Sequence, residues 1–233
     1  MNRRRLYLLL GVPLALVAVV SAGTFAYINF IKEDAPERLS LDNDPAPAAG
    51  SSSSGAPFSL DGTWSVASGS TAGYRAKEVL FGQNTEGAGR TDKVTGQFVI
   101  EASKVATGSF TVDMASITSG ESRRDNQFRG RIMSTSQFPT SSFTLTQPID
   151  LTGLPTDGRT ANTSATGNMT IRGVTRPVTI KLEAKVAGGR IQVAGNQPMV
   201  WADWGIPDPS FGPATVEDRG ELEFLLVFAK AGT

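Results

Sequence analysis

The 233-residue chain carries 22 basic and 22 acidic residues and contains neither cysteine nor histidine. A net charge of zero gives no indication of nucleic-acid binding. The missing residue types exclude disulfides, zinc sites built on Cys or His, cysteine nucleophiles and histidine-based triads. Carboxylate chemistry stays open, but no spacing singles out a catalytic or metal-binding pair among the candidates Asp113, Glu121, Asp125 and Asp203.

The N-terminus is predicted to anchor the chain in a membrane. Arg3, Arg4 and Arg5 precede residues 6–31, which carry no formal charge and exceed the roughly 20 residues that cross a bilayer. The positive-inside tendency places the N-terminus in the cytoplasm and the rest of the chain outside. Residues 1–31 are therefore predicted to be a transmembrane signal anchor, which makes the chain a single-pass protein of the cell membrane. The alternative is a signal peptide cleaved near Ala22 and a secreted product, although the apolar run continues well past that point.

Residues 32–57 have the composition of a linker. They are rich in proline, serine and glycine, and they contain few apolar side chains. Such a segment buries too little surface to offset the entropy lost on ordering. We expect a disordered spacer that holds the following domain away from the membrane.

The folded domain is predicted over residues 58–233, and its main signal is the two-residue period of β-strands. The alternation is clearest at residues 178–186, and Gly188-Gly189 then indicates a tight hairpin. Further strands are expected at residues 74–81, 94–101, 104–114, 143–149, 168–171, 191–193 and 221–230, with a glycine-containing turn at 86–90. Many short strands without a second long helical stripe predict an all-β sandwich or barrel.

The residues on the inward faces of these strands favour a barrel. They are large and flexible or aromatic: Phe98, Phe110, Met114, Phe143, Met169 and Phe224. A barrel of about eight strands has room inside for one small ligand. The same residues would equally serve as a solid core, so periodicity alone leaves the interior open.

Residues 109–139 organise the rest of the domain. They begin as a strand, turn at Ser119-Gly120, pass through the charged stretch 121–128, and lead to the strand that starts at Phe143. A short helical or irregular connector between two strands is typical of the covered mouth of a barrel.

Several motifs are similar to those of one known family. The opening Trp64-Ser65-Val66 resembles its Trp-x-Ile/Val. Further matches are Val94-Thr95-Gly96-Gln97-Phe98, Ser116-Ile117-Thr118-Ser119-Gly120, Arg124-Asp125, Phe138-Pro139 and Asp203-Trp204-Gly205-Ile206. The most specific run covers residues 167–178, GNMTIRGVTRPV, where Gly, Thr, Gly and Pro all fall in register. Together they resemble the YceI-like family of secreted, lipocalin-like polyisoprenoid-binding proteins.

The resemblance implies a lipocalin-like antiparallel barrel that binds a long isoprenoid lipid, either a polyprenyl chain or an isoprenoid quinone. It also implies an extracytoplasmic carrier without catalytic activity, metal or cofactor. The residues expected to line the ligand site are Phe98, Phe110, Met114, Ile117, Phe128, Phe143, Met169 and Trp204. A filled β-domain that acts as an envelope interaction or stress protein is the alternative, and a homodimer stays possible.

Three positions depart from the family pattern. Ser70 and Gln127 stand where the family often has histidine, and Trp201 stands where an arginine is common. These departures bear on contacts to a polar head group and leave the binding of an apolar tail unaffected. Arg124 and Asp125 are predicted to act either as head-group contacts or as a structural clamp, and Trp201, Trp204 and Phe211 either cap the pocket, meet a membrane surface or plug the fold.

Overall fold

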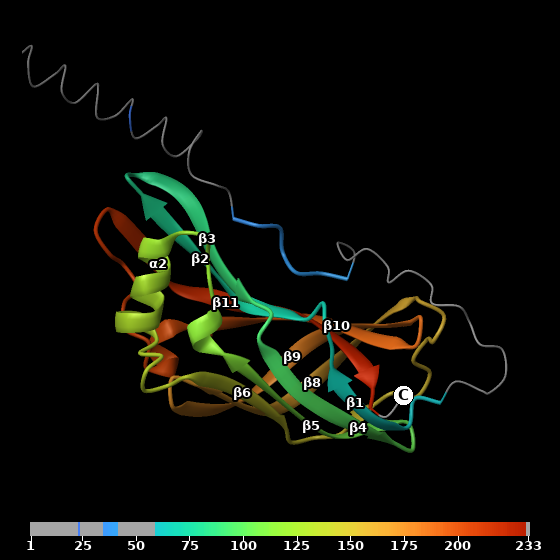
Figure 1. The fold of residues 1–233 in the computed structure, drawn as a ribbon. Helices are drawn as coiled ribbons and strands as arrows, with labels where there is room; N and C mark the ends of the chain where they lie inside the picture. Colours follow the sequence, from blue (N-terminus) through green and yellow to red (C-terminus); the bar gives the residue numbers. More distant parts are fainter. Residues whose placement is uncertain (1–22, 24–34, 42–58, 232–233) are drawn as a thin grey trace, which may run out of the picture.

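A computed structural model of the chain describes residues 23, 35–41 and 59–231. The described part is dominated by one antiparallel sheet that closes on itself (Figure 1). Its strands are β1 (Gly62–Val66), β2 (Thr71–Leu80), β3 (Gln83–Thr91), β4 (Val94–Glu101), β5 (Lys104–Asp113), β6 (Thr140–Leu145), β7 (Ile149–Asp150), β8 (Thr160–Ile171), β9 (Val174–Ala187), β10 (Arg190–Val200) and β11 (Ala214–Lys230).

The sheet forms a closed barrel of 8 strands because β1 with β2, and β3 with β4, act as two long bent strands. β1 pairs with β4 near one end, and β2 pairs with β3 toward the other. The ring then runs through β5, β6, β8, β9, β10 and β11, and β11 returns to both β1 and β2. The predicted lipocalin-like antiparallel barrel is thereby confirmed. Closure leaves fewer unpaired strand edges than an open sheet would.

Ser70 fixes the bend between β1 and β2. Its hydroxyl donates to the carbonyl of Ala67 (2.8 Å) and accepts from the backbone N–H of Val227 on β11 (2.9 Å). The side chain is buried, so both backbone groups are satisfied away from water. The serine that departs from the family pattern therefore has a structural role at this corner.

The predicted connector lies across one end of the barrel. After β5 the chain forms η2 (Met114–Ser116), α2 (Ser122–Gln127) and the π-helical turn η3 (Phe128–Ile132) before β6 begins. In Figure 1 this green segment lies at the same end as the tip of the β2–β3 hairpin, away from the C-terminus. A further short helix, η4 (Trp201–Trp204), follows β10 at this end.

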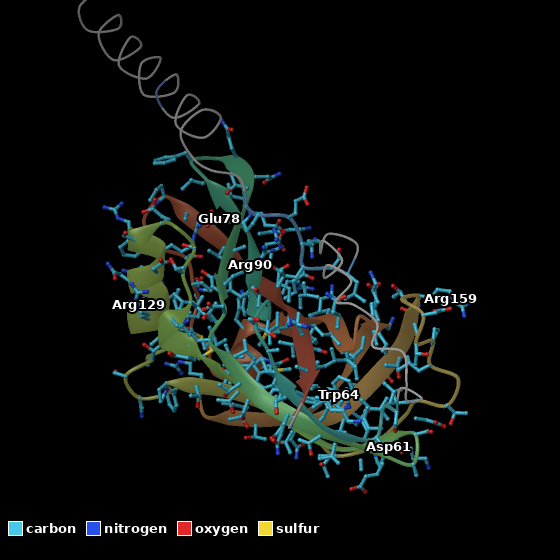
Figure 2. The ribbon with its side chains drawn as sticks, turned by 45° about the vertical axis from the view of Figure 1, so that its right-hand side comes forward. Asp61, Trp64, Glu78, Arg90, Arg129 and Arg159 are labelled. Carbon is cyan, nitrogen blue, oxygen red and sulfur yellow. The ribbon has the colours of Figure 1, made fainter. Side chains whose placement is uncertain are left out.

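The opposite end is filled by aromatic side chains. Trp64 and Phe228 are almost fully buried, and the ring of Phe98 packs edge-on against Phe228 with centroids 4.7 Å apart. Phe110 contacts Phe228 in the same way at 5.6 Å. In Figure 2, Trp64 and Asp61 lie at the end opposite Glu78 and Arg129. The barrel therefore has a closed end around β1 and β4 and a mouth beneath α2.

Several stretches differ from the sequence prediction: residues 146–148 interrupt the strand expected at 143–149, and β10 and β11 extend well beyond the expected ranges 191–193 and 221–230. Residues 86–90, expected to be a turn, belong to strand β3. Gly89 lies on that strand beneath the ring of Tyr74, and a Cβ there would lie 2.6 Å from Tyr74 Cε1. Close packing against an aromatic ring requires glycine just as a tight turn does, so Gly89 by itself does not distinguish a turn from a strand. The strand expected at 168–171 begins earlier, at Thr160, where polar residues hide the alternation.

Residues 35–41, inside the predicted linker, pack along the outer wall of the barrel. Leu41 is buried against Ala194 and Leu225. The backbone N–H of Leu39 donates to Glu223 (3.4 Å). We call residues 35–41 the strap; the blue trace beside β2, β3 and β11 in Figure 1 shows its course. The rest of residues 32–57 lies outside the described part, and the disordered spacer there stays a prediction.

No helix within the described residues is long and apolar enough to cross a membrane. Of the predicted anchor, residues 1–31, only Gly23 belongs to the described part. The anchor therefore stays a prediction from the sequence.

Candidate functional site

The barrel encloses a cavity of about 1170 Å³. This volume exceeds the roughly 300–1,000 Å³ of typical small-molecule sites. The inward faces of the strands supply its walls, because successive side chains of a strand point alternately to the two faces of the sheet. On β9, for example, Ile180, Leu182 and Ala184 line the cavity while Lys181 and Glu183 are exposed on the outer surface.

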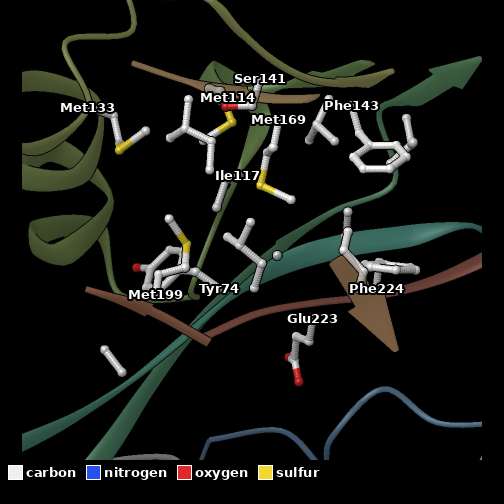
Figure 3. A pocket seen from close by; sticks show the side chains of 18 of the residues that line it. Tyr74, Met114, Ile117, Met133, Ser141, Phe143, Met169, Met199, Glu223 and Phe224 are labelled. Atoms are coloured by element: carbon white, nitrogen blue, oxygen red, sulfur yellow. The ribbon is translucent and has the colours of Figure 1, made fainter. Parts of the chain in front are cut away.

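The lining is overwhelmingly apolar. Figure 3 shows methionine, aromatic and aliphatic side chains converging on the space from opposite walls, among them Met114, Met169, Met199, Phe143 and Phe224. Methionine side chains are flexible and polarizable and adapt to irregular apolar partners. Glu223 in the same view points away from the other labelled side chains, and its carboxylate forms ion pairs with Arg75 and Arg90. The cavity thus suits a long hydrocarbon.

Most of the residues predicted to contact the ligand lie in the wall of this cavity. The cavity wall includes Phe98, Phe110, Met114, Ile117, Phe128, Phe143 and Met169. Trp204 does not line it: this side chain is buried in the core at the mouth end and borders a shallow outer groove with Arg176 and Pro177. Whether the lining residues contact a ligand stays a prediction.

Other lining residues were not singled out from the sequence. Tyr74 lies at an inward position of β2 and stacks on Phe128 with ring centroids 5.0 Å apart. The alternation of Ala72, Tyr74 and Ala76 indicates that Tyr74 faces inward, but the small alanines make this alternation weak. Met199 lies at the end of strand β10, just before η4, and also lines the cavity. Its position next to the tryptophan-rich segment masked the strand pattern.

Burial changes the titration of Tyr74. Desolvation raises the pKa of its phenol to about 12, with Arg124 opposing the shift and the carboxylates of Asp125 and Glu78 adding to it. The phenol therefore stays protonated throughout the physiological range and presents a neutral hydroxyl.

Trp201 occupies the wall where the strand ladder of β11 is interrupted. The register of β11 against β2 shifts between Val216 and Gly220, and the Trp201 ring lies over Gly220. A Cβ at residue 220 would lie 2.3 Å from Trp201 Cζ2. The indole N–H donates to the carbonyl of Glu217 (2.8 Å). Trp201 is thus a fixed wall element at the mouth.

The mouth opens between the β2–β3 tip, α2 and the loop that precedes β11. Phe81, Arg123 and Phe211 come from these three elements and border the cavity. Arg131 holds the loop to η3 by donating to the carbonyls of Asp208 (2.6 Å), Pro209 (3.1 Å) and Ser210 (3.1 Å).

Arg124 and Asp125 have separate positions. Asp125 accepts from the Thr118 hydroxyl (2.6 Å) and from both the N–H (2.8 Å) and hydroxyl (2.6 Å) of Ser119, which ties α2 to the preceding segment. Arg124 lines the cavity mouth and pairs with Glu78 at 2.9 Å. Asp125 therefore has the geometry of the clamp, and Arg124 that of a group at the mouth.

Few polar groups face the cavity. Among the described residues, the Ser141 hydroxyl is buried without a hydrogen-bond partner, and it lies in the wall close to Met114 (Figure 3). The part of the chain that the structure describes holds no cluster of three or more acidic, Cys or His residues suited to a metal ion.

The four carboxylates considered for catalysis are dispersed. Asp113 caps η2 by accepting from the backbone N–H of Ala115, and Glu121 caps α2 by accepting from that of Arg123. Asp125 is the clamp of α2. Asp203 pairs with Arg176 on β9 at 3.0 Å. Each of them thus takes part in a local structural contact.

Comparison with known proteins places the barrel in a family. A family model described as the YceI-like domain matches residues 64–228, which cover nearly all of the sheet. This chain belongs to the YceI-like family. A curated relative, a UPF0312 protein of Shewanella denitrificans, is 28% identical over 143 residues, which cover 58% of this chain and 71% of the relative.

Two solved structures share the fold of this YceI-like chain. A polyisoprenoid-binding domain from Saccharophagus degradans, implicated in plant cell wall breakdown, has a TM-score of 0.58 at 17% identity and covers 72% of this chain and 98% of its own. BcnA from Burkholderia cenocepacia has a TM-score of 0.51 at 23% identity and covers 67% and 95%, respectively. These likenesses establish the fold.

Proposed function

We propose that this YceI-like protein binds a long isoprenoid lipid in its barrel and carries or sequesters it without chemical change. The observation that carries the proposal is the apolar cavity of about 1170 Å³, closed by aromatic side chains at one end and open at the other. Burial of hydrocarbon stabilises a complex by roughly 25 cal/mol per Å², so a long chain inside the cavity needs few polar contacts. The polyisoprenoid-binding neighbour from Saccharophagus degradans supports the same ligand class.

The shape of the site suggests how such a lipid lies. Its tail extends from the mouth toward Phe98 and Phe110, and its polar end stays near Arg124 and Glu78, where the cavity meets solvent. Quinone and polyprenyl phosphate head groups both fit this scheme, since Arg124 and Tyr74 offer donors. The unfilled interior argues against the alternative of a packed interaction domain.

The proposal includes the location. The apolar run of residues 6–31 and the arginines before it support an anchor in the cell membrane, with the barrel on the extracytoplasmic side. We propose no catalytic step, because the candidate carboxylates are dispersed among structural contacts.

The test is native mass spectrometry of the full chain released from a mild detergent, followed by organic extraction of the bound lipid. We expect a co-purified mass that matches a polyprenyl chain or an isoprenoid quinone. A chain that carries no lipid and takes up neither added polyprenol nor quinone would contradict the proposal and support a barrel with another role.

A further inference from the structure

We infer that the barrel mouth rests on the surface of the bilayer in which the chain is anchored, so that the cavity opens directly onto lipid. The inference rests on the proposed membrane anchor, and it goes beyond the proposed function because it concerns a surface of the protein and its orientation. Three observations carry it: the position of the strap, the reach of the chain before it, and the distribution of exposed apolar side chains.

The strap is fastened to the barrel wall by buried charges. Arg75 and Glu223 are each 3% exposed and pair with each other at 3.4 Å. Arg75 also donates to the carbonyl of Pro36, and Arg90 donates to that of Glu37. Arg38 pairs with Glu221 and Glu86. These contacts fix where the chain leaves the wall.

The direction of the strap follows from its partners. Arg38 contacts Glu221, Leu39 contacts Glu223, and Leu41 packs on Leu225, so the strap runs parallel to β11. β11 begins at the mouth, where Ala214 pairs with Leu80 beside the hairpin tip, and it ends at the closed end. The N-terminal end of the strap therefore points toward the mouth (Figure 1).

The reach of the chain then restricts the orientation. From Arg38 back to Ile31, the last residue of the apolar run, a fully extended chain spans at most about 25 Å. The strand between Glu221 and Lys230 is about 30 Å long at ~3.3 Å per residue, so the closed end cannot face the membrane while the strap is docked. The segment from Glu86 on β3 back to Phe81 in the hairpin turn spans only about 17 Å, which the chain can cover.

The exposed apolar side chains of the described part gather in the half of the barrel that contains the mouth. Those of large size are Val79, Phe81, Val200 and Phe211, with exposed fractions of 38%, 52%, 39% and 48%. Phe81 and Phe211 lie on adjacent loops, since the N–H of Phe81 contacts the carbonyl of Pro213, and both border the cavity. Aromatic side chains on a rim are suited to the interfacial region of a bilayer.

The charges on the rim are mixed. Arg123 and Arg131 are exposed there, but so are the acidic Glu121 and Asp208. We therefore expect the contact to depend on the insertion of apolar side chains, with little preference for anionic over zwitterionic lipid.

Site-specific labelling tests this orientation, because the chain contains no cysteine and each introduced one is unique. The full chain is reconstituted into phosphatidylcholine nanodiscs as Phe81→Cys, Glu183→Cys or Thr156→Cys, each labelled with an environment-sensitive fluorophore. Glu183 is exposed on the side wall, and Thr156 is exposed beside the β9–β10 turn at the closed end. Nitroxide-labelled lipid should quench the label at residue 81 and leave the other two labels unquenched.

Quenching at residue 183 or 156 equal to that at 81, or no quenching at any of the three, would overturn the inference. A second measurement separates it from ligand binding. In the double variant Val79→Ser/Val200→Ser, at exposed side chains that do not line the cavity, isoprenoid loading from detergent solution should match the unaltered chain, whereas transfer from vesicles should slow severalfold. Equal transfer rates would contradict membrane docking, while failure to load from detergent in the unaltered chain would contradict only the proposed ligand.

Discussion

At the scale of single residues, the neighbours Arg124 and Asp125 have different roles: Asp125 anchors α2, and Arg124 lies at the mouth of the cavity. Asp125 accepts three hydrogen bonds, one from Thr118 and two from Ser119. Burial acts to raise the pKa of Asp125, but these hydrogen bonds and the nearby Arg129 outweigh it and hold the pKa below its ordinary value. The carboxylate is therefore a fixed anchor for α2, whereas Arg124 faces the mouth.

The pKa of Asp125 gives a prediction about pH. A carboxylate with a lowered pKa in the folded state stabilises the fold fully above the pKa of the unfolded state, and the effect is lost as pH falls through the lower, folded value. Asp125→Asn should therefore lower the Tm by several degrees at pH 7, and the gap to the unaltered chain should shrink below about pH 4. Thermal unfolding of both proteins in mild detergent, from pH 7 to pH 3, measures this difference in Tm.

The exposed Asp92, which pairs with its neighbour Lys93, provides the control for this series. Asp92→Asn should leave the Tm unchanged at neutral pH. A gap for Asp125→Asn that stays constant from pH 7 to pH 3 would show that the clamp does not depend on the charge of the carboxylate.

A second residue-scale prediction concerns the buried pair beneath the strap. Glu223→Gln leaves Arg75 buried with less of its counter-charge, and removing one partner of a buried ion pair costs about 3–5 kcal/mol. The Tm should fall by roughly 10 °C. Glu221→Gln on the same strand removes a more exposed pair with Arg38 and should cost at most about 1 kcal/mol. Equal Tm losses in the two variants would refute the role assigned to Glu223.

At the scale of elements, bends in strands decide how the barrel closes. The chain continues in the same direction from β1 into β2. The two strands nevertheless have different partners, since β1 pairs with β4 and β2 pairs with β3. The short corner at residues 67–70 makes this continuation possible, and Ser70 satisfies the backbone groups that the interrupted ladder leaves there. A similar short corner separates β3 from β4.

Replacing Ser70 by alanine should weaken this corner. The N–H of Val227 would lose its buried acceptor, which costs about 1–3 kcal/mol. The Tm of Ser70→Ala should therefore fall by several degrees, measured by near-ultraviolet circular dichroism on heating. Ser68→Ala changes an exposed residue of the same corner and should have no effect. If the Tm of Ser70→Ala equals that of the unaltered chain, the corner is held by its backbone alone.

At the scale of the whole molecule, the space inside the barrel determines what the protein can bind. Side chains fill the closed end, around Trp64 and Phe228, and leave the middle and the mouth hollow. A second apolar cluster around Phe128 and Trp201 borders the mouth on the side of α2 and η4. The result is a tube with one opening, which suits a long ligand that enters end first.

Filling the tube should reduce lipid uptake without unfolding the barrel. Leu182→Trp places an indole ring in the cavity. The variant should therefore bind severalfold less isoprenoid, while its Tm should change little. Lys181→Trp puts the same ring on the outer surface of the same strand and should bind as the unaltered chain does. Native mass spectrometry after titration with polyprenol compares them, and normal uptake by Leu182→Trp would place the ligand elsewhere.

The amino-acid sequence by itself determined the class of fold and much of the lining. Alternation along strands such as β9 depends only on local geometry, so the inward residues were predictable wherever every second side chain is large. Alternation fails as a guide at Gly87 and Gly89, because glycine serves both turns and strands that pack closely against a side chain, here Arg124 at Gly87 and the Tyr74 ring at Gly89. Only the packing of β2 against β3 distinguishes the two.

Three features follow only from the tertiary structure: which end of the barrel is closed, the separate roles of Arg124 and Asp125, and the position of the strap. Each depends on residues that are far apart in the chain, such as Pro36 with Arg75 or Trp64 with Phe98. The composition of residues 32–57 predicts a linker without structure, because few side chains in this segment are apolar. Charged side chains on β2, β3 and β11 supply the partners that hold it, and no local pattern reveals that they meet.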